Sequence, residues 1–382
     1  MTAGQRLTAL DIFRGMTIML MILVNTPGSF EHVYPMMEHA PWQGCTFADL
    51  VFPFFLFSVG FSSFLSCRKY NFVLSSALIK KILRRTLILF LLGILFNTFP
   101  YYDVTQGLSW DSISSQWSQL RLYGILQRIA LAYLLSTLLC LYLKSTRRIL
   151  LGAALLLILH TAGLILYHPA APYLLETNLS RTIDLWFPGM AHLYQGFGIP
   201  FDPEGLYGAL SAAVNAMLGF LAGRYYTSAP DSPKTLHALA GAGFLCLAIG
   251  LVAGWKIIIC KALWTASYVM LTSGIALLLF TALLYITPIS PLMRLMHPAR
   301  AFGENPLFFF FASAFIALSF AFPWLMIGTP TDAMPAYNWL YTSFFENLYT
   351  PEFGSLLFGI VYLFLCGLGA EFLYCRKIIL KI

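Results

Sequence analysis

The sequence predicts an all-α protein, a polytopic membrane helix bundle with about ten transmembrane helices. Two observations on composition and pattern support this fold class. Hydrophobic residues make up 59% of the 382 residues and charged residues only 10%, whereas a soluble domain carries about 25% charged residues. The mean hydropathy is +0.76, and the apolar runs are continuous, without the two-residue alternation of barrel strands. Since backbone groups in lipid must be satisfied internally, these runs predict helices.

Each apolar run approaches the ~20 residues that a helix needs to cross a bilayer. The first run is not followed by a signal-peptide cleavage pattern, so we expect it to remain as an anchor. Together the runs predict one transmembrane domain over residues 1–382. They centre on residues 12–30, 47–66, 84–100, 121–143, 148–167, 206–226, 236–254, 264–285, 301–322 and 355–375.

The distribution of basic residues is the third observation, and it predicts the orientation of the bundle. If the N-terminus is cytoplasmic, most of the 23 lysines and arginines fall in loops on the cytoplasmic side, as the positive-inside rule requires. Both termini are therefore expected in the cytoplasm. The net charge of +7 is then explained by membrane insertion and contact with lipid, and we expect no nucleic-acid partner.

The loops predicted outside are long and rich in Trp, Tyr, Pro, Gly and carboxylates; they cover 31–46, 101–120, 168–205 and 323–354. Their aromatic residues suit either an interfacial belt or stacking on sugar rings. The loop 168–205 exceeds the ~15 residues beyond which structureless loops are usually functional. It ends in Asp202-Pro203-Glu204, so Asp202 is either the N-cap of the next span or a substrate ligand.

Several polar residues fall within or beside the predicted spans. Buried charges in membranes usually pair with one another or line a pathway. Arg128 and Asp49 could form a structural ion pair, or could line a solute path with Glu304. The polar residues are Asn25, Asp49, Gln127, Arg128, Asn215, Glu304 and Asn305.

The segment from His39 to Pro53 is the strongest candidate for a reactive site. It places an ionisable imidazole before Trp42 and Gly44 and runs into a span that opens with Asp49. Imidazole exchanges protons near neutral pH, and a nearby carboxylate orients it. The amide of Asn25, at the outer end of the first span, is suited to stabilising an oxyanion.

On the cytoplasmic side, Lys81 and Arg85 share one face of a predicted helix. Such a pair binds either anionic lipid or the phosphates of a cofactor. The motifs of nucleotide-binding loops, zinc proteases and serine hydrolases are absent, and no metal site is expected. Among seven cysteines, Cys45 and Cys260 are predicted on the same outer side, where a disulfide could join them.

Ordered motifs along nearly the whole chain give it a family resemblance. It resembles the transmembrane heparan-α-glucosaminide N-acetyltransferases, in their catalytic membrane domain, and their bacterial relatives of unassigned substrate. The motifs are Leu10–Gly15, His39–Gly44, Ala48–Phe54, Leu108–Asp111, Gly124–Arg128, Asp202–Leu206, Leu263–Tyr268 and Gly303–Pro306.

The resemblance implies a membrane acyltransferase that moves an acetyl group from cytosolic acetyl-CoA to an amino sugar on the far side of a bacterial inner membrane. It implies that His39 is the catalytic histidine and that Asn25 lies at the acetyl carbonyl, with Asp49 as their partner. For acetyl-CoA we predict Lys81, Arg85, Gln127 and Arg128. For the acceptor we predict Trp42, Trp110, Asp111, Asp202, Glu204, Trp264 and Asn305.

Several alternatives stay open at this stage. The acceptor could be a hydroxyl of a cell-wall glycan, and His39 could act as a base or be acetylated itself. A solute transporter would often show internal repeats, which this sequence lacks, and a bundle that only binds a partner is a third possibility. A homodimer is possible, and spans with small residues could pack helices closely, at Gly208, Ala212, Ala213 and Gly219.

Overall fold

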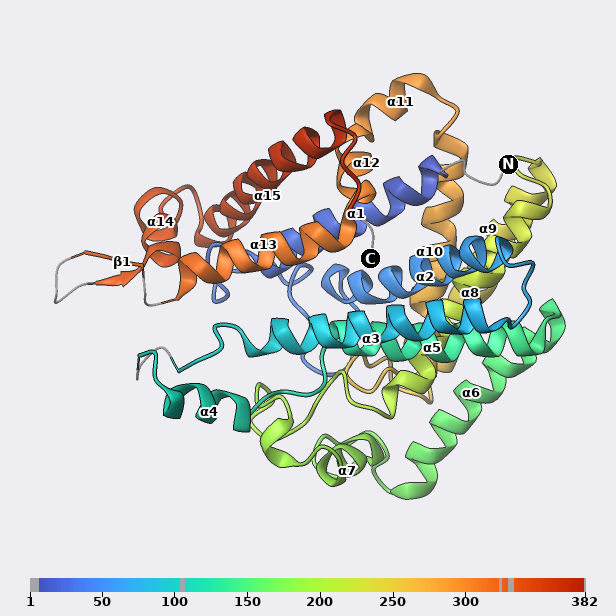
Figure 1. Cartoon of the computed structure of the whole chain (residues 1–382), viewed down its shortest axis with the longest axis horizontal. Helices are drawn as coiled ribbons and strands as arrows, with labels where there is room; N and C mark the ends of the chain where they lie inside the picture. The colour runs from blue at the N-terminus through green and yellow to red at the C-terminus, as the bar shows by residue number, and fades with distance from the viewer. Residues whose placement is uncertain (1–6, 104–106, 323–324, 329–332, 381–382) are drawn as a thin grey trace.

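The computed structural model describes residues 7–103, 107–322, 325–328 and 333–380. The all-α prediction is confirmed, since the described residues contain, besides helices, only one short antiparallel strand pair, β1 (Met326–Ile327) and β2 (Met334–Pro335). Figure 1 shows α14 and β1 beyond one end of α13, while α4 and α7 lie along another edge of the molecule. Parts of the predicted outer loops 101–120 and 323–354 lie outside the described residues.

Each of the predicted spans coincides with a long helix or a helix pair. These are α1 (Thr8–Asn25), α2 (Phe47–Arg68), α3 (Ser76–Thr98), α5 (Ile125–Leu143), α6 (Thr146–Tyr167), α8 (Gly208–Ser228), α9 (Pro233–Ala253), α10 (Ala266–Ile286), α12 (His297–Glu304) with α13 (Pro306–Ala321), and α15 (Pro351–Cys375). The shorter helices are α4 (Trp110–Ser118), α7 (Leu179–Trp186), η1 (Met190–His192), α11 (Ser290–Leu295) and α14 (Ala336–Phe344).

By length and composition, seven helices of the described chain can cross a membrane, or eight if the bent pair α12 and α13 is one span. Two further helices, α3 and α8, have 23 and 21 residues but are less apolar. Lysines and arginines crowd the first half of α3, and small residues fill α8. The polytopic fold is thus supported, with a smaller number of strongly apolar spans than the sequence predicts.

Helix α8 packs tightly against α2 through small residues. A Cβ on Gly219 would lie 2.0 Å from the carbonyl oxygen of Phe57, and one on Gly60 would lie 1.8 Å from that of Ala216. Because Gly208, Ala212, Ala213 and Gly219 are all buried within the chain, this face of α8 is not available to a second copy. The homodimer prediction therefore has no support from these residues.

A second close crossing joins α1 to α12, where Gly15 meets Ala299. Helices α12 and α13 meet at an angle of 91°. At that break, Asn305 donates through Nδ2 to the carbonyl of Ile378 and accepts the amide of Leu380, both at 2.8 Å. Asn305 therefore fastens the C-terminal segment to the start of α13.

The sequence interpretation of Asp202 as a helix N-cap is wrong. Helix α8 begins six residues later, at Gly208. The carboxylate of Asp202 instead accepts the backbone amide of Glu204 at 2.9 Å and binds Arg121. Asp202 thus binds an arginine 81 residues away in the chain and does not cap the helix that follows it.

Candidate active site

Three ionisable side chains meet beside the start of α2. The Nδ1 atom of His39 lies 2.9 Å from Oδ1 of Asp49. The ammonium of Lys261 lies 3.4 Å from the same carboxylate oxygen and 3.0 Å and 3.3 Å from the two ring nitrogens of His39. The contact between His39 and Asp49 expected from the sequence is present, whereas their catalytic role stays a prediction.

Asp49 is held rigidly because it belongs to a helix start. As the third residue of α2, it accepts the backbone amides of Thr46 and Ala40 on Oδ2, at 3.1 Å and 3.2 Å. The hydroxyl of Tyr268 also donates to its backbone carbonyl at 2.6 Å. A carboxylate at a helix N-terminus is stabilised by the helix dipole, so Oδ1 remains directed at His39.

Lys261 is a site residue that the sequence prediction missed. It lies in the segment between α9 and α10, 222 residues from His39. Burial lowers the pKa of its ammonium, and the neighbouring Asp49 opposes that change. One signal was available, because Lys261 is one of the few basic residues on the side predicted to be outside, and it lies two residues before the motif Leu263–Tyr268.

A cavity of about 390 Å³, here called the histidine cavity, adjoins this cluster. When the N–H at Nδ1 donates to Asp49, the Nε2 lone pair of His39 is the one that can accept a proton. Asn25 lines the same cavity, and among the described residues its exposed side chain has no hydrogen-bond partner. The cavity is lined by His39, Lys261, Asn25, Glu204, Phe55 and Phe310, among others.

Arg121 forms a second ionic cluster near this cavity. It binds Asp202 through two hydrogen bonds of 2.8 Å and 2.7 Å and Glu204 through one of 2.5 Å, and it covers the ring of Tyr194. Burial alone would lower the pKa of Arg121, but the bonds to Asp202 and Glu204 hold it above its usual value. Two of the three predicted acceptor carboxylates, Asp202 and Glu204, are thus bound by an arginine that the sequence prediction did not include.

The other predicted acceptor residues are scattered. Trp42 donates to the carbonyl of Tyr173 at 3.0 Å and packs against Phe197. Trp110 is 86% exposed on α4, next to the exposed Asp111. Trp264 is fully buried and donates to Asn215 at 2.9 Å. The structure does not bring these residues together, nor does it bring them to Asn305.

A second cavity of about 520 Å³, here called the basic cavity, lies at the opposite end of the same helices. Its basic lining residues Arg14, Lys69 and Arg85 come from α1, the end of α2 and the first half of α3. Phe55 and Phe310 line both this cavity and the histidine cavity. The two spaces therefore adjoin one another at these two rings.

The residues predicted to bind acetyl-CoA lie in different places. Arg85 lines the basic cavity and covers the ring of Tyr133, while Lys81 donates to Ser66 at 2.8 Å. Gln127 and Arg128 are buried and line neither the histidine cavity nor the basic cavity.

The hypothesis of an ion pair between Arg128 and Asp49 is wrong. Arg128 donates to the carbonyl of Gly205 at 2.7 Å and stacks on Trp264. Asp49 instead contacts His39, from the segment before α2, and Lys261, from the segment between α9 and α10.

The disulfide considered between Cys45 and Cys260 is not formed, since all seven cysteines are free. Burial raises the pKa of both thiols to about 12, so they stay protonated at neutral pH. Within the described ranges, no group of three His, Cys, Asp or Glu side chains is placed to hold a metal ion.

The fold and this site define a polytopic membrane protein with a histidine–carboxylate pair at one end of its bundle. Residues 6–186 match the sequence profile of the family described as heparan-alpha-glucosaminide N-acetyltransferase, catalytic. The human protein of that name is 28% identical over 84% of this chain and 54% of its own length. The mouse protein is 27% identical over 85% of this chain and 55% of its own length.

The resemblance recognised from the sequence motifs is therefore confirmed: the chain is similar to the heparan-α-glucosaminide N-acetyltransferases. It spans about half the length of these relatives. His39, Asn25, Asp49 and Arg128 all fall within the matched residues, whereas Lys261 lies beyond them.

Proposed function

We propose that the protein is a membrane-embedded acetyltransferase that moves an acetyl group from cytosolic acetyl-CoA to an amino sugar or another glycan on the opposite side of a bacterial inner membrane. One observation supports this more than any other. His39, whose Nδ1 contacts Asp49, lines a cavity that adjoins, at Phe55 and Phe310, a second cavity with three basic residues in its lining. A donor with a charged head and a long thin arm fits such a pair of spaces.

The basic cavity suits the phosphates of CoA. The guanidinium groups of Arg14, which also pairs with Asp11, and Arg85 match phosphate geometry. Lys69 adds a third positive charge, and Glu304 adds one negative charge to the lining. Phe55 and Phe310 border both cavities and present apolar rings where the two spaces adjoin, so the uncharged pantetheine arm would lie beside them. The thioester would then be presented in the histidine cavity, beside Asn25.

The residues of the histidine cavity can support direct transfer of the acetyl group from the thioester to the amine. The amine nitrogen of the acceptor attacks the thioester carbonyl carbon, so that a C–N bond forms and the C–S bond breaks. The Nε2 atom of His39 takes the proton from that nitrogen and then gives it to the departing thiolate of CoA, so that the imidazole is again neutral. The amide of Asn25 and the ammonium of Lys261 are donors for the oxygen that becomes negative.

The donor and acceptor predictions are tested with purified protein in proteoliposomes. Radiolabelled acetyl-CoA is supplied on one side and a panel of amino sugars and neutral sugars on the other. We expect labelled amide to form on the acceptor side and His39→Ala to lower the rate by about two to four orders of magnitude. His237→Ala is the control, since His237 is exposed on α9 and lines none of the described cavities.

The outcomes separate the competing functions. Transfer only to neutral sugars would establish an O-acyltransferase, and movement of an unmodified sugar would establish a transporter. No release of CoA with any acceptor would contradict the transferase. Full activity of His39→Ala would contradict only the assignment of that residue.

A further inference from the structure

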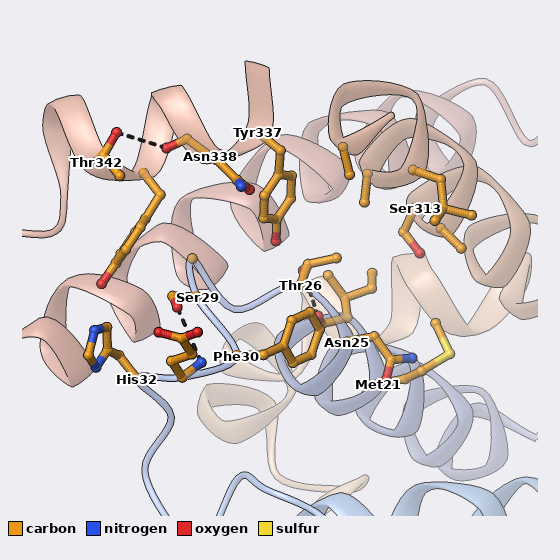
Figure 2. A pocket seen from close by; sticks show the side chains of 18 of the residues that line it. Met21, Asn25, Thr26, Ser29, Phe30, His32, Ser313, Tyr337, Asn338 and Thr342 are labelled. Carbon is orange, nitrogen blue, oxygen red and sulfur yellow. Dashed lines mark hydrogen bonds between the residues drawn. The ribbon is translucent and has the colours of Figure 1, made fainter. Parts of the chain in front are cut away.

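The cavity of about 840 Å³ shown in Figure 2 has no role in the function proposed so far. It lies between the end of α1, the segment that follows α1, α13 and α14. It shares Met21, Asn25, Ile125 and Phe310 with the histidine cavity. The two spaces therefore adjoin at the unpartnered amide of Asn25.

We infer that this larger space, here called the acceptor cavity, binds an amine-bearing sugar and directs its nitrogen past Asn25 toward His39. The inference rests on the proposed acetyl transfer and adds where the acceptor binds. It moves the acceptor site away from the residues predicted from the sequence, because Asp202 and Glu204 are already engaged by Arg121.

The volumes of the two spaces favour this division. Pockets for whole small molecules measure about 300–1,000 Å³, and the histidine cavity has only about 390 Å³. If that cavity holds the acetyl end of the donor, little room remains for a sugar. The acceptor cavity, at about 840 Å³, has room for more than one sugar ring.

The charges of the acceptor cavity match a protonated amine. Glu31 and Glu346 both line it, and neither carboxylate forms a salt bridge to another described residue. Two uncompensated carboxylates raise the local concentration of a cation. Asn338 and Thr342 of α14 add polar groups for sugar hydroxyls, and Figure 2 shows them across the cavity from Ser29 and His32.

The walls of the cavity are held in place by the fold. Tyr337 donates through its hydroxyl to the carbonyl of Pro27 at 2.6 Å. The amide of Gly28 binds the carbonyl of Ser355, and a Cβ on Gly28 would lie 2.2 Å from the ring of Tyr341. Phe30, 69% exposed, offers an aromatic face for the C–H face of a sugar.

The face of α13 toward the cavity carries small residues, including Ala314 and Ala317.

A free amino sugar and one carried on a lipid share the same head chemistry. Both therefore serve as probes, as glucosamine and as an alkyl glycoside of glucosamine.

The test measures transfer kinetics with each probe in detergent. We expect the double variant Glu31→Gln/Glu346→Gln to raise the KM for both probes about tenfold or more, with the KM for acetyl-CoA within about twofold. Glu38→Gln is the matched control, because Glu38 is an exposed carboxylate of the same loop that lines neither cavity. A lower KM for the alkyl glycoside than for glucosamine would identify a lipid-carried acceptor; equal values would identify a free one.

A second pair of variants tests the space itself. Ala317→Trp fills the cavity and is expected to abolish transfer to both probes, whereas Ala312→Trp, on the same helix but away from the cavity lining, keeps it. If the unmodified protein transfers acetyl groups and neither Glu31→Gln/Glu346→Gln nor Ala317→Trp changes the kinetics, the acceptor cavity is ruled out and the acetyltransferase stands.

If no transfer is observed, the proposed function fails, and binding then tests the cavity alone. Glucosamine should raise the melting temperature of the unmodified protein and of His39→Ala, and should not do so for Ala317→Trp. Equal shifts for Ala312→Trp and Ala317→Trp, or no shift in any protein, would overturn the inference.

Discussion

At the scale of single residues, Lys261 changes the chemistry expected of the site. An ammonium about 3 Å from an imidazole is costly to bury unless it also has a negative partner, and Asp49 supplies one. The same cation lies on the wall of the histidine cavity. We expect it to stabilise the oxygen that gains charge during acetyl transfer.

Replacing Lys261 by Met keeps most of the side-chain length but removes the charge. We expect kcat to fall by about 10²–10³, with little change in the KM for acetyl-CoA. Lys256→Met is the matched control, since Lys256 is exposed in the same loop. Equal kcat values for the two variants would remove Lys261 from the mechanism.

The pH dependence of the transferase activity tests the role of Lys261 independently. Because burial lowers the pKa of Lys261, its ammonium loses the proton at a lower pH than a free lysine does. Activity that needs this charge therefore falls as pH rises through that value. Lys261→Arg, which retains a cation at all accessible pH, should shift the alkaline limb of the pH–activity profile to higher pH. An unchanged limb would assign the loss of activity at high pH to another group.

The sequence could predict the meeting of His39 and Asp49 because they are ten residues apart and a helix begins between them. It could not predict the meeting of Lys261 with His39, or of Arg121 with Asp202, because those pairs depend on how distant loops close over the bundle. The roles assigned to Trp110 and Trp264 rested on motif positions alone. Such positions contain no information on burial, and these two residues lie at opposite extremes of exposure.

At the scale of elements, the close crossing of α2 and α8 fixes in place the helix that carries Asp49. Backbone atoms of the two helices approach so closely that a methyl group at Gly219 would overlap the carbonyl of Phe57. Apolar runs predicted the positions of both helices, although α8 is less apolar than α2. The contact between them depends on which glycines face a neighbour, which a single sequence does not show.

Gly219→Ala is therefore expected to destabilise the bundle by about 1–3 kcal/mol, since the overlap is with backbone and cannot be relieved by a side-chain rotation. Gly241→Ala is the control, because a methyl group there meets no atom within 4 Å. Thermal unfolding in one detergent compares the two. We expect a lower melting temperature for Gly219→Ala only, together with reduced transferase activity, because α2 carries Asp49. Equal melting temperatures would contradict the close crossing.

At the scale of the whole molecule, the chain has two chemically different ends. One gathers Arg14, Lys69 and Arg85 around a cavity, and the other gathers His39, Lys261 and two further cavities. The charge pattern of the sequence predicts that the first end is cytoplasmic. The proposed reaction requires the same orientation, since CoA is a cytosolic, highly charged molecule that does not cross lipid.

Cysteine labelling tests this orientation without any assay of activity. Cys375 is the exposed cysteine at the end of α15 among the seven, so a membrane-impermeant maleimide should reach it only from the cytoplasmic side. In a Cys375→Ser background, Trp110→Cys should react only from the outside, because Trp110 is 86% exposed on α4 near the opposite end. The remaining cysteines serve as the internal control, since all of them are at least partly buried. Labelling of both positions from one side would show that the two ends do not face different compartments, and reversed labelling would place His39 in the cytoplasm and exclude transfer to an outer glycan.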